Sequence, residues 1–172
     1  MLRELIGSLT AVYTQTQYAA GATPRLGQVY FDEKNCRKYI FLKNSGATAI
    51  AAQEITMSLT TDKSSFFCSL SAATDALRPF AGVRAVGATS MAQNEYGWFQ
   101  ISGSATFTHS GGQASVAEEG LVSSATTAGR VEGEASGPFT IGSHPGVFAV
   151  AEAAVSTAVD VKGSITRNIW GV

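Results

Sequence analysis

The chain has 172 residues, a formal net charge of −1 and only 15% charged residues. This length suits one domain and is enough to bury a hydrophobic core without a metal or a disulfide. A nearly neutral chain lacks the basic surface that nucleic-acid binding needs, and no run of about 18 apolar residues predicts a membrane span. We therefore expect neither nucleic acid nor a membrane as a partner. The start lacks a signal-peptide pattern, which predicts synthesis and use in the cytoplasm.

Residues 1–23 form an apolar leader ahead of the first clear turn. Its large apolar side chains recur at helical spacing and are Leu2, Leu5, Ile6, Leu9, Val12 and Tyr13. Because glycine and threonine disfavour a helix here, residues 10–17 are better described as an extended arm. Two interpretations stay open: a frayed terminus, or an arm that buries its apolar side chains on a neighbouring subunit.

The next segment predicts a β-hairpin. Residues 27–31 form the first strand, residues 32–35 the turn and residues 37–44 the return strand. The centre of the return strand, residues 39–42, is apolar on both faces, which is typical of a strand that is covered on both sides. A short strand follows from Thr56. The sequence between this strand and the next clear one is hard to assign, and its residues 71–78 are compatible with one or two helical turns.

The most informative stretch is residues 94–108. From Phe99 onward apolar and polar residues alternate, as in a β-strand with one buried and one solvated face. Gly103 takes an apolar position, which predicts a bulge or a bend. Tyr96 and Trp98 fall on the polar side of the pattern. Either another part of the same chain covers these two aromatic rings, or they meet a partner subunit.

Further strands are predicted at residues 82–86, 121–122, 147–151 and 159–166, although residues 149–159 are rich enough in alanine to pass for a helix. Roughly eight short strands separated by turns predict an all-β fold, either a β-sandwich or a β-barrel-like domain. In this interpretation residues 1–23 are an N-terminal arm, residues 24–172 are the β domain, and residues 53–80 are a possible insertion.

The polar residues form no catalytic pattern. The sequence contains neither a Gly-x-Ser-x-Gly motif nor a phosphate-binding loop. Acidic pairs occur at residues 118–119 and at Glu132 and Glu134, but both lie in segments that resemble exposed turns, and His109 is better explained as a turn residue than as a base. We therefore expect no enzymatic activity.

The two cysteines, Cys36 and Cys68, are expected to be reduced, buried thiols. They lie far apart in the sequence, and no cysteine or histidine lies at metal-ligand spacing from another. We therefore expect no metal and no cofactor.

Several short motifs occur in a recognisable order: the hairpin at 27–44, Ala-Ile-Ala-Ala at 49–52, Gly-Val-Arg-Ala at 82–85, Tyr-Gly-Trp-Phe-Gln-Ile-Ser-Gly at 96–103, Gly-Leu-Val at 120–122, Val-Phe-Ala-Val-Ala at 147–151 and Val-Asp-Val-Lys at 159–162. This order resembles the small virion proteins of tailed bacteriophages that decorate or cement the capsid shell. The resemblance covers residues 25–52 and 81–162. It implies an all-β fold on the outside of the head, contact with the major capsid protein, and a homo-oligomer, often a trimer.

The sequence thus favours a structural virion protein on the capsid surface that stabilises the shell by binding it. Subunit or capsid contacts are expected from the apolar residues of the leader and from Tyr96 and Trp98. Two alternatives stay open. One is another virion part, such as a tail or head-fibre component, and the other is a carbohydrate-binding β module that would use Tyr96 and Trp98 with Glu95.

Overall fold

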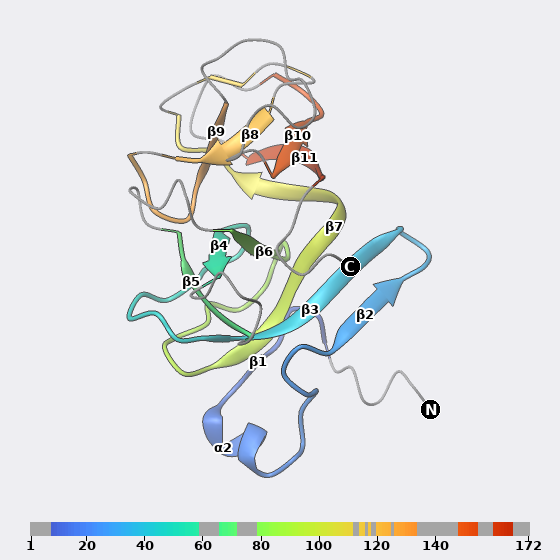
Figure 1. The fold of residues 1–172 in the computed structure, drawn as a ribbon, viewed down its shortest axis with the longest axis vertical. Helices are drawn as coiled ribbons and strands as arrows, with labels where there is room; N and C mark the ends of the chain where they lie inside the picture. The colour runs from blue at the N-terminus through green and yellow to red at the C-terminus, as the bar shows by residue number, and fades with distance from the viewer. Residues whose placement is uncertain are drawn as a thin grey trace.

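The fold was analysed in a computed structural model. The structure describes residues 8–58, 66–71, 79–111, 114–115, 117, 120–124, 126–133, 148–154 and 160–166. In these ranges the chain is nearly all β, with eleven strands and one helix of 5 residues (Figure 1). The all-β prediction is confirmed, whereas the predicted number of about eight strands is too low. No helix in the described ranges is long and apolar enough to cross a membrane.

Five strands close into a small barrel: β3 (Arg37–Asn44), β4 (Ile55–Ser58), β5 (Phe67–Leu70), β6 (Phe80–Arg84) and β7 (Tyr96–Thr108). The pair β3–β5 is parallel, and the antiparallel pairs β5–β4, β4–β6, β6–β7 and β7–β3 complete the ring. Closure pairs both edges of each of these strands. Inward-facing side chains fill the barrel and form a buried cluster of Ile40, Leu42, Ile50, Cys68, Ala81, Met91, Phe99 and Ile101.

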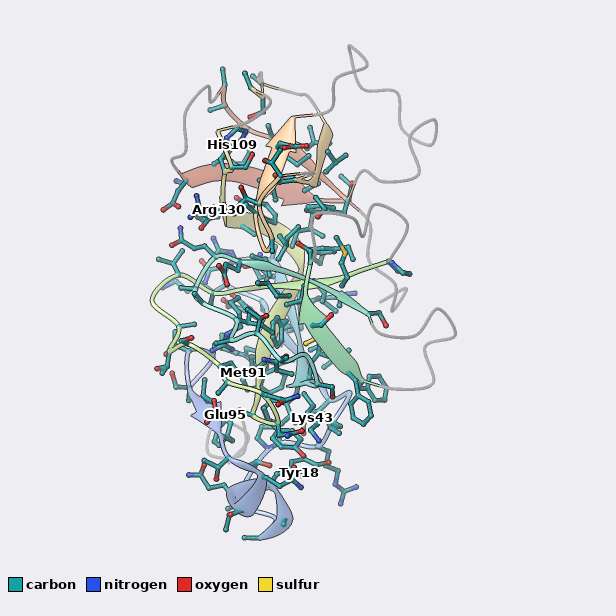
Figure 2. All side chains as sticks on the ribbon, turned by 90° about the vertical axis from the view of Figure 1, so that its left-hand side faces the viewer. Tyr18, Lys43, Met91, Glu95, His109 and Arg130 are labelled. Atoms are coloured by element: carbon teal, nitrogen blue, oxygen red, sulfur yellow. The ribbon has the colours of Figure 1, made fainter. Side chains whose placement is uncertain are left out.

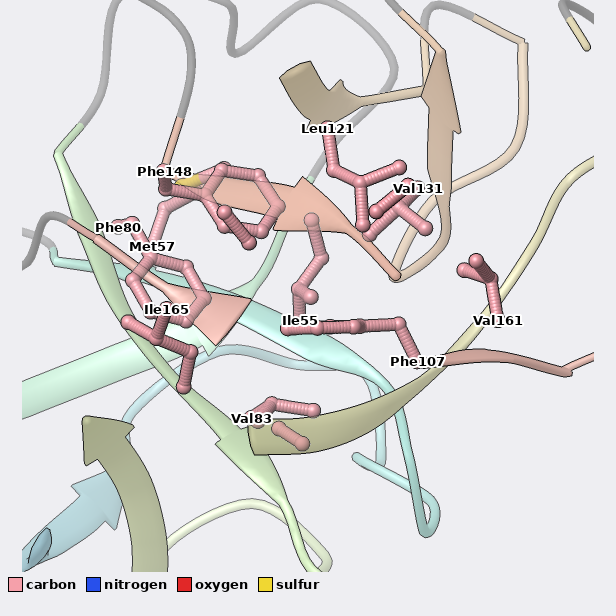
Figure 3. Close-up of a cluster of buried hydrophobic side chains, with 13 residues drawn as sticks. Ile55, Met57, Phe80, Val83, Phe107, Leu121, Val131, Phe148, Val161 and Ile165 are labelled. Carbon is pink, nitrogen blue, oxygen red and sulfur yellow. The ribbon is translucent and has the colours of Figure 1, made fainter. Parts of the chain in front are cut away.

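A second sheet is built on the far half of β7. There β7 pairs with β11 (Asp160–Ile165), which pairs with β10 (Ala149–Ala151), and β8 (Gly120–Ser123) and β9 (Val131–Gly133) follow in that order. The inner face of this sheet packs on the outer face of the barrel. Figure 3 shows the shared core, in which barrel residues Ile55, Met57, Phe80 and Val83 lie among Phe107, Leu121, Val131, Phe148, Val161 and Ile165.

Strand β7 therefore belongs to both halves of the molecule, and Gly103 marks the change. Residues 96–102 pair with β3, whereas residues 103–108 pair with β11. Gly103 has a φ of +84°, and the register of the β3–β7 pair shifts beside it, between Lys38 and Tyr39. A Cβ atom at this position would lie 2.6 Å from the carbonyl oxygen of Cys36. The predicted bend at Gly103 is confirmed, and it requires glycine both for its backbone angle and for the close approach of the hairpin turn.

Most of the predicted strands are present. The hairpin is confirmed, because β2 (Val29–Asp32) pairs in antiparallel fashion with β3, and residues 39–42 are buried as expected. Strands β5 and β9 were not predicted. Residues 53–80, separated in the sequence as a possible insertion, contribute β4 and β5 to the barrel.

Three predictions about individual segments need comment. Of the alanine-rich residues 149–159, the first three form strand β10 and not a helix, while residues 155–159 lie outside the described ranges. The possible helical turns at 71–78 also lie outside them, apart from the first residue. Cys68 is buried as predicted, but Cys36 is exposed, because it occupies the hairpin turn with a φ of +51°; both thiols are free.

Replacing Gly103 by alanine should destabilise the fold more than the same change at Gly87. Gly87 has a similar φ of +72° but nothing within 4 Å of a new Cβ atom. We expect Gly87→Ala to lower the free energy of unfolding by about 1 kcal/mol through backbone strain. Gly103→Ala should cost about 2–4 kcal/mol, because the contact with the Cys36 carbonyl adds to that strain. Urea unfolding of the two variants provides the measurement, and equal losses would contradict a packing role for Gly103.

Candidate interaction surfaces

The outer face of β3 and β7 carries a cluster of aromatic side chains. We call Tyr39, Phe41, Tyr96 and Trp98 the aromatic cluster; each is at most 4% exposed. The ring of Phe41 meets that of Trp98 edge to face, with centroids 5.3 Å apart. Such offset or edge-on arrangements are favourable in addition to the area that they bury. The cluster faces away from the barrel interior, so another part of the chain must shield it from water.

The leader provides part of this shield, and Leu26 and Tyr30 from the start of the hairpin provide the rest. Strand β1 (Val12–Tyr13) pairs with the start of β7, and helix α2 (Gln15–Ala19) follows it. Tyr18 of this helix stacks on Tyr96 with ring centroids 4.3 Å apart, and the Tyr96 hydroxyl donates to the side-chain oxygen of Gln15. Figure 2 shows Tyr18 at the α2 end of the molecule, with His109 towards the opposite end. The leader therefore packs on its own chain through Leu9, Val12, Tyr13 and Tyr18.

The expectation of an extended arm over residues 10–17 is wrong for its last three residues, which lie in helix α2. Helix α2 begins after Thr14, whose side chain accepts a hydrogen bond from the backbone N–H of Gln17, while the side chain of Gln17 accepts from the backbone N–H of Thr14. This reciprocal capping box stabilises a first helical turn. Together with the packing of Tyr18 it offsets the weak helix propensity of the threonines.

The predicted contact residues now have definite positions. Leu9 and Tyr13 are half-buried against the aromatic cluster, and Val12 packs against the barrel cluster. Tyr96 and Trp98 are buried, so the alternative in which the chain itself covers them is what the structure shows. Neither ring is accessible for stacking on a sugar, as the carbohydrate-binding alternative required. Three further predicted residues lie outside the described ranges: Leu2, Leu5 and Ile6.

Sequence reasoning missed a different surface, the outer edge of β2. The large hydrophobic side chains that remain exposed in the described ranges are Val29 at 41%, Phe31 at 48% and Val86 at 60%. Two of these three lie on β2, which is the terminal strand of the sheet and, among the strands of the described ranges, pairs with β3 only (Figure 1). The sequence contained a signal for this surface. Val29 and Phe31 alternate with Tyr30, which predicts that the side chains of Val29 and Phe31 lie on the same face of the strand.

The barrel encloses a buried cation. Arg84 is 0% exposed, and its guanidinium donates to the backbone carbonyl oxygens of Trp98 and Thr89, each at 2.9 Å. It also lies over the ring of Phe99, 5.4 Å from the centroid. Burial lowers the pKa of Arg84 to about 10, an effect that the neighbouring Cys68 opposes. These contacts tie β6 to β7 inside the barrel, which is a structural role.

The polar residues that were considered for chemistry have structural contacts as well. The His109 ring is buried, and its Nδ1 accepts a hydrogen bond from the backbone N–H of Gly111 at 3.0 Å, which stabilises the turn after β7. Ser110 donates from its hydroxyl to Glu132 at 3.3 Å. The acidic residues at 118–119 and Glu134 lie outside the described ranges. Within those ranges no group of three or more potential ligands could hold a metal ion.

The sequence matches no known protein-family model and no curated protein. The fold resembles a chain from the capsid of Myoviridae phage XM1, with a TM-score of 0.55 and 10% sequence identity over 84% of this chain and 91% of that chain. It also resembles the N base of the head fibre gp8.5 of bacteriophage phi29, with a TM-score of 0.46 and 12% identity over 76% of this chain and 94% of that chain. The structure thus shares its fold with a chain of a phage capsid, as the sequence motifs led us to expect.

Truncating the aromatic cluster should reduce stability. Because Trp98 is fully buried, Trp98→Ala should lower the free energy of unfolding by about 3–5 kcal/mol, as measured by urea or thermal unfolding. Val86→Ala removes an exposed apolar side chain and serves as the control, with an expected change within about 0.5 kcal/mol. A Trp98→Ala protein as stable as the control would contradict the burial of this ring between Phe41 and Tyr30.

Buried Cys68 should make the fold sensitive to alkali. Burial raises the pKa of this thiol from 9.0 to about 12, so the folded state holds the proton more tightly than the unfolded state. The stability that the buried Cys68 thiol contributes is therefore fully present below pH 9 and is lost as the pH rises towards 12. Relative to Cys68→Ala, the free energy of unfolding of the wild type should fall by about 1.4 kcal/mol per pH unit in this window.

Denaturant unfolding from pH 8 to 11 measures this difference. Ionisation of the tyrosines is common to all variants and cancels in the comparison. Cys36→Ala, which removes the exposed thiol, should retain the wild-type profile. Parallel pH profiles for the wild type and Cys68→Ala would contradict the burial of a protonated thiol in the barrel.

Proposed function

We propose that this chain is a structural protein of a phage virion that binds the outside of the head and stabilises the capsid shell. The observation that carries the proposal is the fold shared with a chain of the phage XM1 capsid over 84% of this sequence. Fold alone does not define function, so the ordered motifs at 27–44, 96–103 and 147–162 are the second support. They resemble the decoration and cement proteins of tailed phages.

The proposed partner is the major capsid protein, and the proposed location is the capsid surface, reached after synthesis in the host cytoplasm. A protein that binds the assembled shell but not its dissociated subunits stabilises the shell by mass action. A copy that bridges several capsid subunits gains further affinity through effective concentration. A homo-oligomer, with a trimer favoured by the resemblance, would supply several such contacts at once. The rigid barrel and its fused second sheet suit this task, because they present fixed surfaces.

The leader remains the proposed capsid contact. From residue 8 onward its apolar residues pack on the chain itself, so the contact is assigned to Leu2, Leu5 and Ile6. Burying leucine and isoleucine side chains on a partner stabilises a complex by about 1.5–3 kcal/mol each when the burial is complete.

Binding to empty heads of the same phage tests the function, and variants of the leader test the contact. The purified chain should co-sediment with heads and raise the temperature at which they disassemble. A triple variant, Leu2→Ser with Leu5→Ser and Ile6→Ser, should keep its melting temperature but bind heads at least about tenfold more weakly. Changing the polar residues of the same segment, Arg3→Ser with Glu4→Ser, is the matched control and should leave binding unchanged. Absence of any binding to heads would overturn the function, whereas equal binding by both variants would overturn only the contact.

A further inference from the structure

The leader is held to the rest of the fold by few contacts. None of residues 8–22 is buried, and helix α2 has no buried residue among its 5. Strand β1 pairs with β7 at two positions, Val12 with Gly97 and Tyr13 with Tyr96. A helix as short as α2 has no stability of its own in water. Segments with few buried contacts open before the rest of a protein unfolds, so we expect the leader to detach while the barrel stays folded.

A reversal of the backbone after α2 returns the chain to its own barrel. The N–H of Gly21 donates to the carbonyl oxygen of Tyr18, and the N–H of Ala22 donates to the carbonyl oxygen of Gln17. These two bonds form the Schellman motif, which ends a helix at a residue in the left-handed conformation. Gly21 is that residue, with a φ of +72°, and a Cβ atom there would have nothing within 4 Å. The backbone angle alone therefore requires glycine here, and we call residues 20–22 the hinge.

We propose that the leader is an exchangeable strap, which leaves its own β7 and docks in the same way on β7 of a second copy of this chain. In the receiving site residues 96–97 pair with β1, the Tyr96 ring stacks on Tyr18, and the Tyr96 hydroxyl donates to Gln15. Exchange keeps each of these contacts and changes only the path of the hinge. Domain swapping of this kind is a low-cost route to an assembly of identical subunits.

A second copy is the occupant because the site already fits this leader. The ring of Tyr13 meets that of Phe41 edge to face, with centroids 5.7 Å apart, and Leu9 packs on the same aromatic cluster. A segment of another protein would have to reproduce these contacts, whereas every copy of this chain carries them. Leu26 and Tyr30 keep their own contacts with the cluster while the leader changes places, so the open intermediate stays partly shielded from water.

Concentration decides which copy the leader occupies. On its own chain the leader has an effective concentration of roughly millimolar, because the hinge is short. We therefore expect wild-type protein at micromolar concentration to keep its leader, and we expect exchange where copies are held close together. The exchange goes beyond the proposed function and does not depend on it.

Changing the hinge tests the exchange. Gly21→Val disfavours the left-handed backbone angle by roughly tenfold and leaves the receiving site untouched. An exchanged pair extends both of its hinges and so relieves this strain twice, which should lower its dissociation constant roughly a hundredfold relative to the wild type. Gly21→Ala should shift the constant in the same direction. Gly87→Val is the matched control, because Gly87 has the same φ of +72° and the same open space around it, and it should associate like the wild type.

Sedimentation velocity over a concentration series gives the dissociation constants, with 17.9 kDa as the mass of one chain, and thermal unfolding checks that each variant is folded. Adding Tyr18→Ala to Gly21→Val removes the stack on Tyr96 and should return the protein to the association of the wild type or below it. Non-specific association through an uncovered aromatic cluster would instead increase when Tyr18 is lost. That increase, or equal association by Gly21→Val and Gly87→Val, would overturn the proposal.

Discussion

The continuity of β7 is the constraint on which the rest of the structure depends. One strand of 13 residues gives its first half to the barrel and its second half to the outer sheet. Two curved sheets can share a strand only where the backbone turns sharply, and the φ of +84° at Gly103 provides that turn. Because the β2–β3 turn packs directly over this glycine, the hairpin and the outer sheet are fixed relative to each other. The two halves are therefore expected to unfold as one unit.

The first half of β7 is also buried on both of its faces. Phe99 and Ile101 point into the barrel, while Tyr96 and Trp98 point outward, where the leader and strand β2 cover them. A strand covered on both faces cannot show a simple alternation of polar and apolar residues. The leader therefore completes the core and is more than a tether, because it packs on the aromatic cluster outside the barrel and, through Val12, on the cluster inside it.

The sequence predicted what depends on local pattern. The hairpin at 27–44, the alternating half of β7 and the bend at Gly103 all follow from period-two patterning and turn chemistry. Helix α2 was missed because its stability comes from the capping box at Thr14 and from the stacking of Tyr18, and not from intrinsic propensity. Strands β5 and β9 were missed because nothing in their local sequence marks them, and each is defined by its pairing with other strands, β5 with β3 and β4 and β9 with β8.

The candidate surfaces were likewise predicted only as far as the local sequence pattern allows. Tyr96 and Trp98 were singled out correctly as residues that break the polar pattern, but the pattern alone left open what covers them. Val29 and Phe31 looked like ordinary hairpin residues, because exposure at a sheet edge depends on strand order, and strand order is set by contacts between residues distant in sequence. Barrel closure likewise depends on the parallel pairing of β3 with β5, which no local signal predicts.

The central functional claim is that this chain sits on the outside of a phage head, where a rigid double-sheet domain adds contacts to the shell. A cryo-electron microscopy reconstruction of the mature virion tests it most directly. The account predicts density on the outer capsid surface, in contact with the major capsid protein, into which the barrel and the sheet of β8 to β11 fit as one body. Density for the chain in the tail alone, or a mature virion that lacks the protein, would contradict it.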